Sequence, residues 1–289
     1  MDAIGCVLLP GTCPLCGSPL PRLSSVPICD ACWAEFPVQS GASCACCGDS
    51  LHAPAPATAS GNTTLCRACR LAPPTFERAV AYGPYEGRMR DAIHALKYSS
   101  LRPAARRLGR MLAEAIAQLA TEAPAEMLVV PVPLHHSKHR GRGFNQARIL
   151  AEHALSRLRR THPAWRLTLA PRLLVRPRAT HSQAGLTPRQ RRINLRGAFH
   201  VAEPASVAGR HVLVIDDILT TGATARAAAQ ALVNAGAGSV WVATLARVQR
   251  SNVYRSGDAA LFNDRAVPGN VLAIDLHAES RHEQNEPSF

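Results

Sequence analysis

Eight of the ten cysteines in this 289-residue chain stand in pairs whose spacing suits a metal ion. Each pair has the form Cys-x-x-Cys, and the pairs are Cys13/Cys16, Cys29/Cys32, Cys44/Cys47 and Cys66/Cys69. Two thiolates at this spacing hold one side of a tetrahedral Zn²⁺ ion, and a second pair completes the site. The unit occurs twice, as CPLCG…CDAC and CACCG…CRAC. We therefore predict about two structural zinc ions.

The spacing of the pairs leaves their partnership open. Twelve residues separate the pairs of the first unit and eighteen those of the second, so each unit can close on its own ion. A crossed arrangement, which joins the first pair to the third, is the alternative. Disulfides fit poorly with the reducing cytosol, and four pairs are too many for a single redox motif. Cys6 and Cys46 have no partner pair and are taken as bystanders.

A second stretch whose residue types could bind a ligand is HVLVIDDILTTGATARAAAQAL, residues 211 to 232. A hydrophobic strand runs directly into two carboxylates, Asp216 and Asp217, and a loop of small residues then leads into an alanine-rich helix. The loop residues are Thr220, Thr221, Gly222, Ala223 and Thr224. Small residues let backbone N–H groups approach a phosphate, and the helix N-terminus adds a favourable dipole. The acids would repel phosphate but suit ribose hydroxyls, so the stretch predicts a sugar-phosphate site, with Mg²⁺ held through a diphosphate. The alternative is a strand end whose acids cap the helix.

The charge of the chain also points to an anionic ligand. The formal net charge is +13, and Glu152 is the only acidic residue between Glu126 and Glu203, where arginines recur. This segment fits a site for phosphate, pyrophosphate or nucleic acid. A solvated basic face is the alternative.

Helices and strands alternate from Phe76 onward, which indicates a parallel α/β sheet with flanking helices. The expected helices cover 88–98, 103–119, 144–160 and 223–236, with a short helix inside 176–196. The expected strands cover 127–134, 167–175, the aspartate-bearing segment and 239–248.

The cysteines and the tail set the expected boundaries between parts of the chain. We expect a zinc-binding module over 1–75, the α/β domain over 76–248 and a flexible tail over 249–289, and we expect the first two to have separate cores. No apolar run is long enough to cross a bilayer, and the N-terminus has no basic leader. These features predict a soluble cytoplasmic protein without a membrane span.

The motifs together resemble a known family. VLVIDDILTTGAT resembles the signature of type I phosphoribosyltransferases, which bind phosphoribosyl pyrophosphate (PRPP). The wider set is similar to the ComF family of competence proteins, which carry an N-terminal double zinc ribbon. The segments that carry this resemblance are YEGRMRDAIHALKY (85–98), VPVP…RGFNQA (130–147) and THSQAGLTPRQRRINLRGAF (180–199). The resemblance implies a type I phosphoribosyltransferase-like parallel sheet with flanking helices, preceded by the zinc ribbons.

The resemblance also assigns roles to residues. It implies that Asp216 and Asp217 contact the ribose and that residues 220–224 hold the 5-phosphate of PRPP. It implies that the loop after VPVPL and the two other motifs hold pyrophosphate or nucleic-acid phosphate. The residues in question are Lys138, Arg140, Arg142, Asn145, Gln146, Gln183 and Arg192. For Phe144 the alternative is a place in the core, and Asn145 and Gln146 could cap and begin a helix.

Two classes of function follow from these features. In the first, the protein binds PRPP or a related nucleotide phosphate and acts in DNA uptake through single-stranded DNA, together with the uptake machinery. In the second, it is an active phosphoribosyltransferase that moves phosphoribose from PRPP to an unidentified acceptor. Aromatic residues for base stacking are few, namely Tyr82, Tyr85, Phe144 and Trp165. No catalytic residue is assigned, since a PRPP loop alone does not establish turnover.

Overall fold

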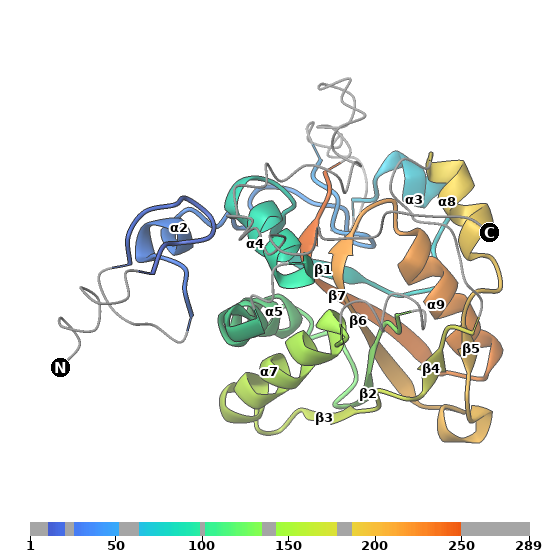
Figure 1. Ribbon diagram of the computed structural model, residues 1–289. Coiled ribbons are helices and arrows are strands. Elements are labelled where there is room, and N and C mark those ends of the chain that lie inside the picture. Colours follow the sequence, from blue (N-terminus) through green and yellow to red (C-terminus); the bar gives the residue numbers. More distant parts are fainter. Residues whose placement is uncertain are drawn as a thin grey trace, which may run out of the picture.

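A five-stranded sheet forms the centre of the molecule (Figure 1). The computed structural model describes residues 11–20, 26–51, 64–98, 102–134, 143–177 and 187–249. The strand order is β1-β7-β6-β2-β3, and every neighbouring pair is parallel. The strands are β1 (Ala79–Pro84), β2 (Glu126–Pro131), β3 (Arg166–Leu169), β6 (His211–Leu219) and β7 (Ser239–Arg247). The parallel α/β architecture predicted from the sequence is confirmed.

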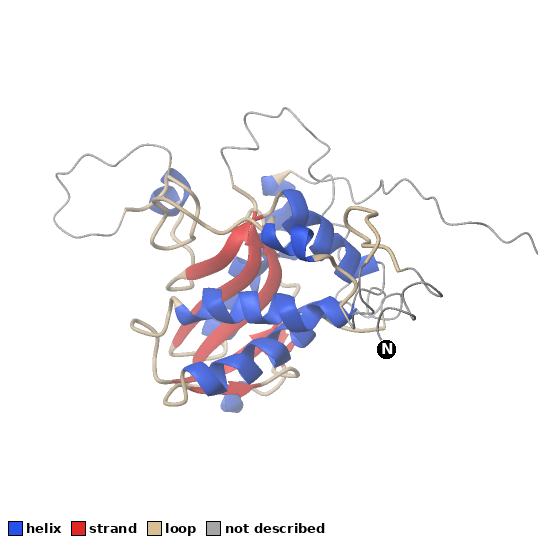
Figure 2. Ribbon diagram, turned by 90° about the vertical axis from the view of Figure 1, so that its left-hand side faces the viewer, coloured by secondary structure: helices blue, strands red, loops and turns tan. Residues whose placement is uncertain are grey.

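Helices cover both faces of this sheet. One face carries α4 (Gly87–Tyr98), α5 (Ala105–Ala117) and α7 (Gln146–Thr161), as Figure 2 shows from that side. The other face carries α9 (Ala223–Asn234), with α8 (Pro188–Leu195) against it and the short antiparallel pair β4 (Leu174–Val175) and β5 (His200–Val201) beside it. The remaining elements are α2 (Asp30–Ala34), α3 (Arg67–Leu71), η1 (Arg102–Ala104) and η2 (Pro204–Ser206). No helix in the described ranges is long and apolar enough to cross a membrane.

Burial of both faces of strand β6 explains the unbroken hydrophobic run in its sequence. Leu213 and Ile215 lie in the core under α5 and α7, whereas Val212 and Val214 lie in the core under α9. All four are fully buried. Because successive side chains of a strand point to opposite faces, burial of both faces demands apolar residues at every position. After its first residue, His211, the strand is polar only near its carboxyl end, at Asp216 and Asp217.

One predicted strand is divided in the structure, and one observed strand was not predicted. The single strand expected over 167–175 is divided into β3 and β4, and Pro171 lies in the turn between them. Proline lacks the N–H that a ladder needs and fixes its own φ, so the pairing of β3 cannot continue through it. Strand β1 was not predicted. It is short and contains Gly83, whose missing side chain is required because a Cβ there would lie 1.9 Å from the carbonyl oxygen of Pro37.

The expectation of separate cores for the cysteine-rich region and the α/β domain is wrong for the first cysteine unit. Cys32, Trp33 and Phe36 belong to the same hydrophobic core as helices α4 and α5. The guanidinium carbon of Arg107 lies 4.4 Å from the centre of the Trp33 ring. The second unit forms a small cluster of its own, and the backbone N–H of Ala79 donates to the carbonyl of Cys46 at 2.7 Å. Both units are therefore attached to the sheet domain by packing or hydrogen bonds.

Candidate metal centres and phosphate-binding site

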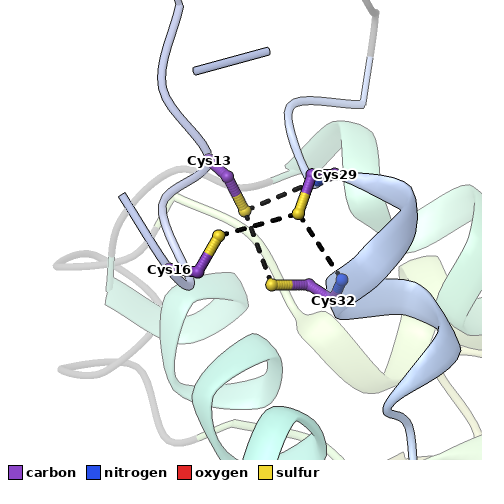
Figure 3. Close-up of side chains that lie close together, drawn as sticks. All are labelled: Cys13, Cys16, Cys29 and Cys32. Carbon is purple, nitrogen blue, oxygen red and sulfur yellow. Dashed lines mark hydrogen bonds between the residues drawn. The ribbon is translucent and has the colours of Figure 1, made fainter. Parts of the chain in front are cut away.

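The first four cysteines gather their sulfur atoms around one point, as Figure 3 shows. The sulfurs of Cys13 and Cys32 lie 3.8 Å apart, and those of Cys16 and Cys29 lie 3.6 Å apart. Cys29 also caps helix α2, because its sulfur accepts the backbone N–H of Cys32. The helix thus fixes the spacing of the second pair.

The second set consists of Cys44, Cys47, Cys66 and Cys69, and all four are buried. The sulfurs of Cys47 and Cys66 lie 3.7 Å apart, and the sulfur of Cys44 accepts the backbone N–H of Cys66 at 3.2 Å. A tetrahedral Zn²⁺ with Zn–S bonds of about 2.3 Å places its sulfurs about 3.8 Å from one another, so both sets fit the ion. The sets resolve the pairing as sequential rather than crossed, and Cys46 belongs to neither.

The loop after β6 has the form expected of a phosphate site. Gly222 directly precedes helix α9 with φ 77° and ψ 8°, a left-handed conformation that favours glycine. Gly222 has no side chain to cap this helix, and the hydroxyl of Thr221 accepts the N–H of Ala223 at 3.4 Å. A Cβ built on Gly222 would meet no atom of the described residues within 4 Å, so that part of the chain leaves room at this position. The N–H groups in the first turn of α9 have no intrahelical acceptors and point toward the loop that precedes the helix.

The two acidic residues at the end of β6 have different environments. Asp217 is buried, and its Oδ2 lies 2.7 Å from the ammonium nitrogen of Lys97 on α4. Asp216 is half-buried, and its Oδ1 accepts the backbone N–H of Asp217 at 2.9 Å. Asp217 therefore contacts the α4 side of the sheet through Lys97, whereas the carboxyl of Asp216 folds back onto the backbone of its neighbour. At the end of β6, Asp217 is thus already paired with a cation of the protein.

Their electrostatics differ in the same way. Burial, reinforced by the charge of Asp217, raises the pKa of Asp216 well above its usual value. Burial alone would lower the pKa of Lys97, but the charge and hydrogen bond of Asp217 outweigh it and the pKa is raised. Asp217 thus holds Lys97 in its charged form, whereas ionisation of Asp216 is disfavoured until a ligand or cation supports it.

Two residues near these acids were missed by the sequence reasoning. Lys97 carried one usable signal, since it is one of only two lysines in an arginine-rich chain. Arg176 follows β4, is half-buried, and places its guanidinium carbon 5.4 Å from the centre of the Phe199 ring. Burial lowers the pKa of Arg176, and the charge of Asp216 opposes this effect. Nothing in the local sequence distinguishes Arg176 from the many other arginines.

The residues of the RGFNQ motif that the structure describes are engaged in the fold. Asn145 caps α7 by accepting the N–H of Arg148 at 3.2 Å, and it donates to the carbonyl of Val132 at 3.0 Å. Gln146 begins the helix and is buried. Phe144 is also buried, and the guanidinium carbon of Arg102 lies 4.7 Å from the centre of its ring. This motif therefore fixes the start of α7 to the end of β2.

The other predicted phosphate contacts are only partly visible. Lys138, Arg140, Arg142 and Gln183 lie outside the described residues. Arg192 lies on α8, and the structure describes its backbone only. Helix α8 begins with a capping box in which Thr187 and Gln190 exchange side-chain to backbone hydrogen bonds.

Comparison with known proteins finds a family match for the cysteine-rich part and another for the sheet domain. A family model described as "Double zinc ribbon domain" matches residues 5–70, and one described as "Phosphoribosyl transferase domain" matches residues 149–264. "DNA utilization protein YhgH" of Escherichia coli (strain K12) is 35% identical over 242 residues, which cover 83% of this chain and 98% of that protein. "Competence protein F" of Haemophilus influenzae is 28% identical over 224 residues, which cover 76% of this chain and 90% of that protein. The chain belongs to the ComF family. The two cysteine sets of this ComF-family chain are thus the two structural zinc sites of its double zinc ribbon, and the loop after β6 lies in its phosphoribosyltransferase domain.

Proposed function

We propose that the protein binds PRPP or a related nucleotide phosphate, with Mg²⁺, at the loop between β6 and α9. We further propose that it acts in DNA uptake or utilisation by handling single-stranded DNA. The observation that carries the first part is the arrangement around Gly222. A left-handed glycine at the start of a helix and a nearby half-buried carboxyl lie together at the carboxyl edge of a parallel sheet.

Each part of PRPP has a matching group at this edge. The 5-phosphate would accept hydrogen bonds from the loop N–H groups and the threonine hydroxyls of residues 220–224. Asp216 would accept hydrogen bonds from the ribose hydroxyls, because Asp217 already pairs with Lys97. Mg²⁺ would bridge the diphosphate, and its charge would favour the ionised form of Asp216. Lys97 thus acts by holding Asp217 and the strand end in place.

The proposed role in DNA handling draws on the relatives and on surface charge. The similar proteins are named for DNA utilization and for competence. Helix α7 carries four exposed arginines, namely Arg148, Arg157, Arg159 and Arg160. The basic loop with Lys138, Arg140 and Arg142 precedes this helix in the chain. Arg148 lies in the first turn of α7 and pairs with Glu152, whereas the other three arginines lie near the end of the helix. Exposed cations suit a phosphate backbone without selecting a base sequence.

A second candidate is catalysis of phosphoribosyl transfer, which the match to the phosphoribosyl transferase domain favours. Such a reaction needs electrostatic stabilisation of an oxocarbenium-like centre and of the leaving pyrophosphate. The basic loop after β2 would supply the second of these. The acceptor is not identified.

Titration of the full-length protein with a labelled oligo-dT strand at two salt concentrations tests the proposed DNA role. Affinity should fall steeply as salt rises, since binding releases counterions from the strand. Affinity that is absent, or that ignores salt, would refute single-strand handling. Release of pyrophosphate from PRPP when nucleobases or nucleosides are added would favour the transferase instead.

A further inference from the structure

Arg247, the last residue of β7, is a cation buried beside the second zinc ribbon. Its side chain is 1% exposed. One guanidinium nitrogen, Nη2, lies 3.5 Å from the sulfur of Cys47 and 3.4 Å from a carboxylate oxygen of Asp49. Its Nε has no hydrogen-bond partner among the described residues. A buried guanidinium is costly unless nearby negative charge offsets it, so this environment calls for an explanation.

The charge of the zinc centre provides that explanation. Four thiolates and one Zn²⁺ ion leave two negative charges uncompensated. In the first centre Cys16 is exposed and Cys29 half-buried, so water can screen this charge. In the second centre all four cysteines are buried. The second centre therefore needs a positive group from the protein, and Arg247 contacts one of its sulfurs.

We propose that Arg247 donates a hydrogen bond to the zinc-bound thiolate of Cys47 and offsets the charge of the second zinc centre. The sheet domain thereby completes a metal site whose four ligands all come from the ribbon. Partners of this kind around a metal ligand raise metal affinity about ten- to a hundredfold.

This arrangement connects the zinc centre to the loop after β6. The carbonyl of Arg247 accepts the N–H of Tyr85 at 2.7 Å, and Arg247 pairs in register with Leu219 of β6. The N–H of Val248 donates to the carbonyl of Leu219 at 3.0 Å. Leu219 is the residue directly before the loop. The ordered end of β7 therefore supports both the zinc centre and the start of the loop.

A plain structural ion pair between Arg247 and Asp49 is the competing explanation. It predicts that Arg247→Met harms the protein only by removing the ion pair of a buried carboxylate. Removal of both charges in the double variant Asp49→Asn with Arg247→Met would then restore zinc retention. Our proposal predicts the opposite, because the double variant still lacks the cation at Cys47.

The test measures zinc transfer from the full-length, zinc-loaded protein to a chromophoric chelator, followed by alkylation of the freed thiols and mass spectrometry. Arg247→Met and the double variant should each release one zinc about ten- to a hundredfold faster than wild type. Alkylation should map this loss to the second cluster, whose ligands are Cys44, Cys47, Cys66 and Cys69.

Two further variants separate charge from packing. Arg247→Lys keeps the cation and should recover most of the zinc retention. Arg226→Met is the matched control, because the guanidinium of Arg226 donates to the carbonyl of Ala72 at the end of α3, at 2.8 Å. This variant should release zinc at the wild-type rate. Wild-type release from the double variant, equal loss from both clusters, or no recovery with Arg247→Lys would overturn the proposal.

Discussion

The ion pair between Lys97 and Asp217 gives a quantitative prediction for stability. The lysine side chain is 17% exposed and that of the aspartate 8%, so Asp217→Asn would leave a largely buried ammonium group without its counter-charge. Breaking a buried pair by removing one partner costs about 3–5 kcal/mol. Because the lysine keeps some access to water, we expect a loss of about 3 kcal/mol. At about 2–4 °C per kcal/mol for a domain of this size, the melting temperature should fall by about 6–12 °C.

The neighbouring carboxyl supplies the matched control for this prediction. Folding raises the pKa of Asp216, so the stability it contributes is present below its unfolded pKa and is lost as pH rises through its folded pKa. At neutral pH Asp216→Asn should therefore leave the melting temperature unchanged or raise it. The double variant Lys97→Met with Asp217→Asn removes the pair as a whole and should recover most of the loss. Scanning calorimetry of the four proteins measures these effects. Equal shifts for the two aspartate variants, or a double variant as unstable as Asp217→Asn, would refute the reasoning.

Three other expectations concern metal, nucleic acid and pH. Elemental analysis should find about two zinc ions per chain. A zinc-free wild type would contradict this. Cys29→Ser should remove about one zinc ion and also lower the melting temperature of the whole protein, because the first ribbon shares the core of α4 and α5. Arg140→Ala with Arg142→Ala should weaken binding of single strands of every sequence alike and flatten its salt dependence, and an unchanged salt slope in the binding assay would argue against it. Affinity for PRPP with Mg²⁺ should rise as pH increases through the raised pKa of Asp216, since the ionised carboxylate accepts the ribose hydroxyls. Calorimetry across this pH range should show no pH dependence of the affinity for Asp216→Asn. An equally steep pH dependence in this variant would exclude Asp216 as the titrating group.

The parts of the fold and site that could be predicted are those encoded by nearby residues. The zinc ligands follow from the Cys-x-x-Cys spacing, and each ribbon closes on its own set because its two pairs are near in sequence. Strand β6 and its loop follow from a hydrophobic run that ends in two acids and a glycine. Strand β1 was missed because it contains Gly83, which is unusual in a strand. The reason for this glycine is a close contact with the backbone of Pro37, a residue distant in the sequence.

The contacts that define the electrostatics of both sites could not be predicted, because they join distant parts of the chain. Lys97 meets Asp217 only after α4 packs on the sheet. Arg247 lies 200 positions from Cys47 in the sequence, yet their side chains are in contact. The sequence reasoning treated Asp216 and Asp217 as equivalent, whereas Asp217 has a buried lysine partner and Asp216 is only half-buried. Local patterns carry no information about such pairs.

The most direct test of the proposed PRPP site is calorimetric titration of PRPP and Mg²⁺ into wild type, Gly222→Ala and Gly209→Ala. Both glycines have positive φ, 77° and 68°, and a Cβ built on either meets no atom of the described ranges within 4 Å. Both variants should therefore lose similar stability, about 1–2 kcal/mol. Only the Cβ at Gly222 would enter the space assigned to the 5-phosphate. We predict that wild type and Gly209→Ala bind PRPP alike, while Gly222→Ala binds about ten- to a hundredfold more weakly. Absence of binding to wild type, or equal binding by the two variants, would contradict a phosphate site at this loop.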